Sequence, residues 1–147
     1  MKIVSKSLKE TKGAAQLILA NLLKAKSQKL KAVVLLLEGD LGSGKTTFVQ
    51  FLAQELGVKS NLTSPTFVLM KKYEILRKGN FKHLIHIDAY RLNSGQDLLA
   101  LGWAELTANP TNLIVIEWPE RVADLWTGRE HKINFKFIDD QTREISD

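Results

Sequence analysis

Apolar residues recur along this chain with two different spacings. Uninterrupted apolar runs at Val33–Leu37 and Leu113–Ile116 are typical of strands that are buried on both faces of a sheet. Residues 8–26 instead repeat leucine, isoleucine and alanine at near-helical spacing, and residues 48–56 form a second helix-like segment that ends at Gly57. Buried strands separated by amphipathic helices predict an α/β fold with parallel strands at its centre.

Shorter segments predict antiparallel additions to this centre. Residues 66–75 and 81–87 are rich in β-branched and aromatic residues and flank a turn, so we expect them to pair as a hairpin. Residues 131–138 alternate apolar and polar side chains, which predicts a half-exposed antiparallel edge strand. The remaining predictions are a strand at 2–7, a helix at 95–101, and loops at 59–65 and 107–112. No repeat or linker divides the chain, so we expect one domain over residues 1–147.

The composition narrows the class of protein. Hydrophobic residues make up 44% of the chain and charged residues 25%, as in globular domains. No apolar run approaches the about 20 residues of a membrane span, and the first residues do not resemble a secretory signal. The chain has no cysteine, which excludes disulfides and thiolate metal sites. We therefore expect a cytoplasmic protein without membrane contact.

The net charge of +5 is concentrated at the start of the chain. Residues 1–31 hold eight lysines and one acidic residue, Glu10, whereas acidic residues outnumber basic ones in the remainder. A lysine-rich edge of this kind faces RNA, an acidic protein partner or solvent alone. The sequence leaves these alternatives open.

The segment from Gly39 to Thr46 matches the phosphate-binding pattern G-x-x-x-x-G-K-[ST]. An apolar strand precedes it and a helix follows it, which is the context that this pattern requires. The glycines allow successive backbone N–H groups to surround a phosphate, and the helix N-terminus adds its positive dipole end. Lys45 is expected at the β- and γ-phosphates and Thr46 on Mg²⁺. The nucleotide-binding residues predicted here are Asp40, Leu41, Gly42, Ser43, Gly44, Lys45, Thr46 and Thr47. The fold is thus expected to be a P-loop NTPase-like domain with helices on both faces.

Two apolar strands end in a carboxylate. Asp88 follows residues 84–87, and Glu117 follows Leu113–Ile116. In open α/β sheets such residues lie at the carboxyl ends of neighbouring strands, where they hold Mg²⁺ or orient a nucleophile. We therefore predict that Asp88 and Glu117 serve the nucleotide site. His86 alternates with Ile85 and Ile87 and is expected to be a structural hydrogen-bonding residue.

Five short motifs occur in the order typical of one protein family. They are Gly39–Thr47, Ser64–Phe67, His86–Leu92, Leu101-Gly102 with Glu105, and Glu117–Glu120. Together they resemble the TsaE (YjeE) family, the bacterial P-loop ATPases of tRNA threonylcarbamoyladenosine biosynthesis. The resemblance extends from about residue 7 to residue 122, and residues after 125 match no motif of that family. It implies an ATP- and Mg²⁺-dependent ATPase, weak alone, that acts with the TsaD and TsaB proteins and affects tRNA indirectly.

The resemblance also implies roles for individual residues. Thr46 and Asp88 would coordinate Mg²⁺, and Glu117 would act on Mg²⁺ or on the attacking water. Lys45 and Glu117 are the predicted catalytic residues. Thr66, in the switch-like Ser64–Phe67 loop, would sense the γ-phosphate. Trp118 would lie beside the nucleotide. We also expect Arg91 to be the better placed of the arginines for stabilising charge, unless a partner supplies that group.

Two other functions fit parts of the sequence. A small-molecule kinase shares the phosphate loop and this chain length, but such kinases usually carry a lid with several arginines. Here five arginines are scattered along the chain: Arg77, Arg91, Arg121, Arg129 and Arg143. A nucleic-acid-binding module would explain the lysine-rich start, but the chain lacks a basic surface interleaved with aromatic residues.

Overall fold

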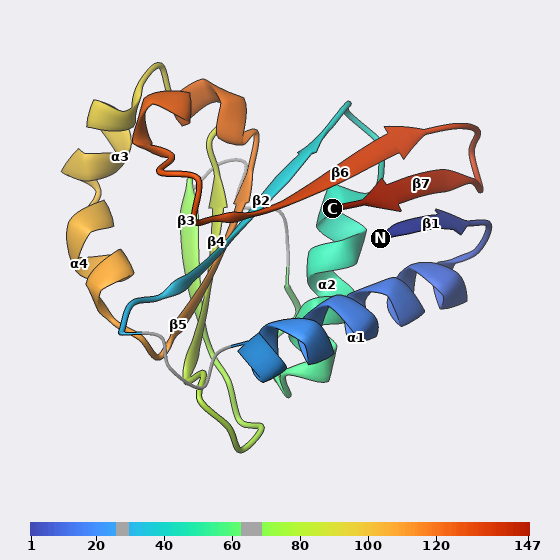
Figure 1. Cartoon of the computed structure of the whole chain (residues 1–147), viewed down its shortest axis with the longest axis horizontal. Coiled ribbons are helices and arrows are strands. Elements are labelled where there is room, and N and C mark those ends of the chain that lie inside the picture. Colours follow the sequence, from blue (N-terminus) through green and yellow to red (C-terminus); the bar gives the residue numbers. More distant parts are fainter. Residues whose placement is uncertain (26–29, 63–68) are drawn as a thin grey trace.

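The computed structural model describes residues 1–25, 30–62 and 69–147. Its centre is a seven-stranded sheet with the strand order β1-β7-β6-β2-β5-β4-β3 (Figure 1). The strands are β1 (Lys2–Ser5), β2 (Val33–Gly39), β3 (Met70–Glu74), β4 (His83–Asp88), β5 (Asn112–Glu117), β6 (His131–Phe137) and β7 (Arg143–Ser146). The helices are α1 (Leu8–Ala25), α2 (Lys45–Glu55), α3 (Gly95–Ala100), α4 (Trp103–Ala108) and the 3-10 helix η2 (Pro119–Leu125).

The predicted combination of parallel centre and antiparallel additions is confirmed. Strand β2 pairs parallel with β5 on one side and with β6 on the other, and β5 pairs parallel with β4. Strand β3 pairs antiparallel with β4, which confirms the predicted hairpin. Strands β7 and β1 continue the opposite edge in antiparallel order. The carboxyl ends of β2, β4 and β5 consequently lie together at one end of the sheet.

Helices cover both faces of the sheet, as expected (Figure 1). Successive residues of a strand point to opposite faces. In β2, Leu35 and Leu37 belong to the core that includes residues of α1 and α2. Val34 and Leu36 belong to a second core beneath α3, α4 and η2. An uninterrupted apolar strand therefore reflects burial against two layers of helices.

The prediction that residues 131–138 form an antiparallel edge strand is wrong in its position. Strand β6 lies inside the sheet, parallel to β2 and antiparallel to β7. Its buried residues, Ile133 and Phe135, belong to the core under α1 and α2. The second core draws its sheet residues from β2, β4 and β5 and leaves the other face of β6 exposed. The alternation of apolar and polar residues in β6 thus indicates that one face of this strand is not covered by helices. It does not indicate that the strand lies at the edge of the sheet.

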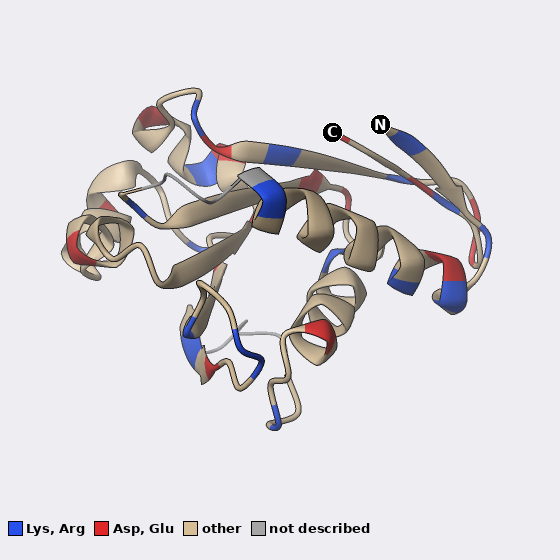
Figure 2. Ribbon diagram, turned by 60° about the horizontal axis from the view of Figure 1, so that its bottom comes forward, with Lys and Arg blue, Asp and Glu red and all other residues tan. Residues whose placement is uncertain are grey.

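Several predicted segments differ in extent from the observed elements. The predicted strand at 66–75 is described from Met70 onward as β3, and residues 63–68 lie outside the described residues. Sequence reasoning did not anticipate α4, η2 or β7. Figure 2 shows lysines at both ends of α1, within the lysine-rich first part of the chain. Within the described ranges, no helix combines the length and the apolar character that crossing a membrane requires.

Candidate functional site: a phosphate loop flanked by buried carboxylates

The phosphate loop connects the end of β2 to the start of α2. Gly39, Gly42 and Gly44 all have positive φ angles, of 152°, 78° and 99°. At Gly39 a side chain is also excluded by space, because a Cβ there would lie 2.9 Å from the Cβ of Phe135. Helix α2 begins at Lys45 directly after Gly44, so its free N–H groups and positive dipole end face the loop. This backbone geometry fits an anionic phosphate.

A cavity of ≈ 530 Å³ opens at the loop. Most of the residues predicted for the nucleotide site lie together in its lining. The lining residues are Leu41, Gly42, Ser43, Gly44, Lys45, Thr46, Thr47, Asp88, Tyr90, Glu117, Trp118 and Arg143. Asp40 begins the loop but is exposed and does not line this cavity in the described part of the chain. Thr66 lies outside the described residues.

Lys45 lies in this cavity with its side chain largely buried. Its ammonium group donates a hydrogen bond to the carbonyl oxygen of Gly39 and lies 3.9 Å from the ring centroid of Trp118. Burial lowers the pKa of Lys45 below its usual value of 10.5, although the nearby carboxylates, first of all Glu117, act in the opposite direction. Because these contacts leave the ammonium poorly solvated, a phosphate placed in the loop gains a strong charge partner.

Glu117 stands at the centre of a buried polar network. The Thr46 hydroxyl lies 3.0 Å from Oε1 and 3.3 Å from Oε2 of Glu117. The Nε2 atom of His86 lies 2.7 Å from the same Oε2, and the His86 side chain is fully buried. His86 and Glu117 are held on neighbouring strands, β4 and β5, and Thr46 on the first turn of α2. His86 was expected to be a hydrogen-bonding residue, and its partner in the structure is the carboxylate of Glu117.

Asp88 is directly opposite Glu117 in the register of β4 and β5. Its Oδ1 accepts a hydrogen bond of 2.9 Å from the backbone N–H of Tyr90. The Thr46 hydroxyl contacts Glu117, and no hydrogen bond between Thr46 and Asp88 occurs among the described residues. Two carboxylates and a hydroxyl beside a phosphate loop are hard oxygen donors, which suit Mg²⁺. Mg²⁺ at such sites retains waters and phosphate oxygens as ligands, so an all-protein cage is not required.

Aromatic residues form one wall of the cavity. Trp118 has a left-handed backbone conformation, with φ of 58°, at the point where β5 passes into η2. Its ring packs edge-to-face on Tyr90, with centroids 5.1 Å apart, while the Arg121 guanidinium lies 5.0 Å from the Tyr90 ring. Trp118 therefore lies beside the phosphate loop, and its contact with a nucleotide stays a prediction. Arg91 is exposed and is not among the cavity-lining residues in the part of the chain that the structure describes.

Sequence reasoning missed Arg143, which completes the lining of the cavity. It lies beyond residue 125, where no family motif was found. The signal available in the sequence was weak: a turn at residues 139–142 and then a short apolar–polar segment. Such a segment predicts a strand only when its pairing partner is known.

The chain matches one protein family over nearly its whole length. Residues 5–145 match the family described as "Threonylcarbamoyl adenosine biosynthesis protein TsaE". The chain belongs to the TsaE family. Its relatives include the tRNA threonylcarbamoyladenosine biosynthesis protein TsaE of Rickettsia typhi, 38% identical over 95% of this chain and 89% of that protein. The protein of the same name from Treponema pallidum is 40% identical over 77% of this chain and 79% of that protein.

One solved structure has a similar fold. YdiB of Bacillus subtilis superposes on 99% of this chain and 82% of its own, with a TM-score of 0.67 and 31% sequence identity. The match with the TsaE family reaches into β7, because it extends to residue 145. The sequence resemblance had ended near residue 122, so the comparison places the C-terminal strands within the family domain.

Proposed function

We propose that this protein is an ATP-binding and ATP-hydrolysing subunit of tRNA threonylcarbamoyladenosine biosynthesis. One observation carries this proposal: a buried lysine, a hydroxyl and two carboxylates converge on a phosphate loop in a chain of the TsaE family. The relatives from Rickettsia typhi and Treponema pallidum carry the name of that pathway.

The proposed roles follow from position. The backbone of Asp40–Thr47 surrounds the phosphates, and the Lys45 ammonium leaves the Gly39 carbonyl to pair with the β- and γ-phosphates. Thr46 and Asp88 would hold Mg²⁺, which neutralises charge on the phosphates when it is bound. Glu117 orients the attacking water, with its carboxylate fixed by His86. Trp118 flanks the nucleotide, and Thr66 senses the γ-phosphate.

The partner proposal concerns the mouth of the cavity. Leu41 is 87% exposed and Tyr90 is 49% exposed, and both line the cavity. Apolar side chains exposed beside a nucleotide site are suited to contact with another protein. By resemblance to the family, the partners are TsaD and TsaB, and tRNA is affected indirectly, in the cytoplasm. Hydrolysis is then slow for the subunit alone and faster in the complex.

A small-molecule kinase is the competing function. A kinase requires a pocket for an acceptor and cations that close over the transferred phosphate. Of the described arginines, Arg143 alone lines the cavity, whereas the others lie elsewhere on the chain. This distribution favours hydrolysis over transfer to a metabolite.

The test measures phosphate release from ATP and Mg²⁺ by this protein alone and with TsaD and TsaB. We expect partner-stimulated release without an added acceptor, and loss of nucleotide binding and release in Lys45→Ala. Lys24→Ala, on the exposed end of α1, is the matched control. Phosphate transfer to a metabolite without hydrolysis would overturn the proposal in favour of a kinase. Normal hydrolysis in a folded Lys45→Ala protein would overturn the assignment of the loop.

A further inference from the structure

Arg143 reaches the phosphate loop because β7 runs against the parallel strands. Strand β6 is parallel to β2, and β7 is antiparallel to β6. The first residue of β7, Arg143, therefore lies at the same end of the sheet as the last residue of β2, Gly39. A residue at the start of a late antiparallel strand is thus placed at the cavity.

The side chain of Arg143 rests on the backbone of the loop. Arg143 and Ile145 point to the same face of the sheet, and Ile145 is buried in the core that contains Phe48 of α2. Arg143 therefore lies on the face of the sheet that α2 covers. A Cβ placed at Gly44 would lie 3.0 Å from Cδ and 3.1 Å from Cζ of Arg143. Gly44 thus leaves room for the guanidinium as well as adopting its positive φ.

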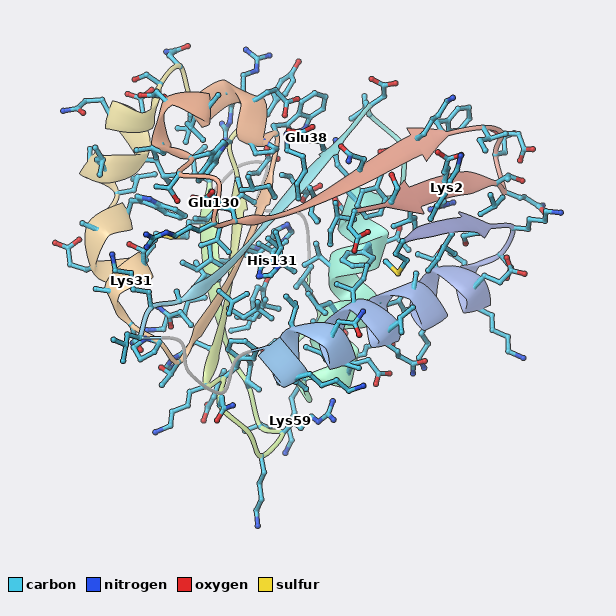
Figure 3. All side chains as sticks on the ribbon, in the orientation of Figure 1. Lys2, Lys31, Glu38, Lys59, Glu130 and His131 are labelled. Carbon is cyan, nitrogen blue, oxygen red and sulfur yellow. The ribbon has the colours of Figure 1, made fainter. Side chains whose placement is uncertain are left out.

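The positive charge of Arg143 has no acidic partner in the described ranges. Its neighbour Glu144 points to the other face, where its Oε2 atom lies 3.2 Å from the Nζ atom of Lys2. Lys2 is labelled in Figure 3. No salt bridge joins Arg143 to a carboxylate among the described residues. The guanidinium instead lies against the positive end of α2 and lines the same cavity as Lys45. Such an arrangement attracts an anion.

The order of strands in the sheet indicates which part of a bound nucleotide would lie next to the Arg143 guanidinium. Glu117 and Asp88 lie on β5 and β4, to one side of β2, whereas β6 and β7 lie on the other side. The contact between Thr46 and Glu117 marks the first side as the one for Mg²⁺ and the terminal phosphate. A phosphate chain laid across the N-terminus of α2 consequently directs its nucleoside end toward Arg143.

We propose that Arg143 binds the α-phosphate and nucleoside end of the bound nucleotide. This assignment rests on the proposed ATP-binding function. A guanidinium forms paired hydrogen bonds with a phosphate, which an ammonium does not reproduce. The C-terminal hairpin of β6 and β7 is therefore part of the nucleotide site, in addition to its place in the sheet.

The test compares affinities of Arg143→Gln and wild-type protein for ATP, ADP and inorganic tripolyphosphate, by displacement of a fluorescent ADP analogue. We expect ATP and ADP to bind about 10-fold or more weakly, each by the same factor, because one charged hydrogen-bonding partner is lost. Tripolyphosphate keeps a phosphate at the α-position, so its affinity should also fall, by no more than that of ATP. Arg129→Gln, on an exposed turn, is the matched control. Arg143→Lys keeps the aliphatic contact with Gly44 and should lose less affinity.

The outcomes separate the two proposals. A wild-type protein that binds no nucleotide overturns the ATP-binding function itself. A wild-type protein that binds nucleotide, with Arg143→Gln and Arg143→Lys binding it equally well, overturns only the role of Arg143. A loss for ATP and tripolyphosphate that spares ADP, which lacks the γ-phosphate, places Arg143 at the terminal phosphate and also overturns the assignment. If Arg143→Gln does not fold by circular dichroism, the Arg143→Lys measurement decides.

Discussion

The polar side chains on the two sides of the phosphate loop differ in whether the protein itself supplies their hydrogen-bonding and charge partners. On the side of β4 and β5, Glu117 is buried and bonded to both Thr46 and His86. On the side of β6 and β7, Arg143 is partly exposed and rests on Gly44 without a carboxylate partner among the described residues. The first side is fixed by the protein alone, whereas the second provides a charge that a ligand can satisfy. We therefore expect catalysis and Mg²⁺ binding on the first side, and Mg²⁺-independent nucleotide affinity on the second.

The largest effect that tests this comparison is expected from Glu117→Gln. The amide keeps the shape and still accepts hydrogen bonds, so ATP binding should be nearly unchanged. Hydrolysis should slow by ~10²-fold or more, because the group that orients water has lost its charge. Single-turnover hydrolysis and nucleotide titration measure the two effects separately. Glu38→Gln, which removes an ion pair with Lys132 outside the cavity, is the control. Normal hydrolysis in Glu117→Gln would remove Glu117 from the mechanism.

Asp88→Asn tests whether Asp88 binds Mg²⁺ while Glu117 orients the attacking water. If Asp88 binds Mg²⁺, the affinity for ATP should fall by about 10-fold in the presence of Mg²⁺ and remain unchanged with EDTA. Parallel ATP titrations with and without Mg²⁺ provide the measurement, with Asp97→Asn in α3 as the control. An Asp88→Asn protein with full Mg²⁺ dependence would move the metal role to Glu117, whose carboxylate already contacts Thr46.

His86→Asn tests whether the network on the β5 side positions Glu117. Without the 2.7 Å contact from His86 Nε2, the Glu117 carboxylate can rotate away from its place beside Thr46. We expect kcat to fall by about 10-fold with little change in ADP affinity. His83→Asn, at the other end of the same strand, controls for changes in β4 itself. A loss of stability with unchanged kcat would make His86 a structural residue only.

The smallest expected effect is on the free energy of unfolding, which the burial of the charged Lys45 side chain lowers. Burial lowers the pKa of Lys45 in the folded protein below 10.5, so the folded state loses this proton at lower pH than the unfolded chain. Between those two pKa values the unfolded state binds more protons, and the free energy of unfolding rises with pH. Lys45→Met removes this contribution. Urea unfolding should therefore show Lys45→Met at least as stable as wild type at neutral pH, with its advantage shrinking toward pH 10.5. A clear destabilisation at neutral pH would contradict the expectation.

The sequence by itself determined the central part of this protein. The apolar runs at Val33–Leu37 and Leu113–Ile116 predicted doubly buried strands, because a strand covered by helices on both sides has no polar face. The spacing of glycines predicted the phosphate-binding conformation of the loop, because positive φ angles favour glycine. Asp88 and Glu117 were predicted to meet, because parallel strands end at one edge of the sheet.

Only the tertiary structure decided the rest. The alternating pattern of residues 131–138 does not determine which strands pair with β6. Alternation depends on which faces of a strand are covered and not on the order of strands in the sheet. The bonds that join Glu117 to Thr46 and His86 depend on how α2, β4 and β5 pack together. Arg143 reaches the loop through the reversed direction of β7, across more than a hundred residues from Gly39. Local patterns fix local conformation, whereas contacts between distant segments follow from the order and direction in which those segments pair.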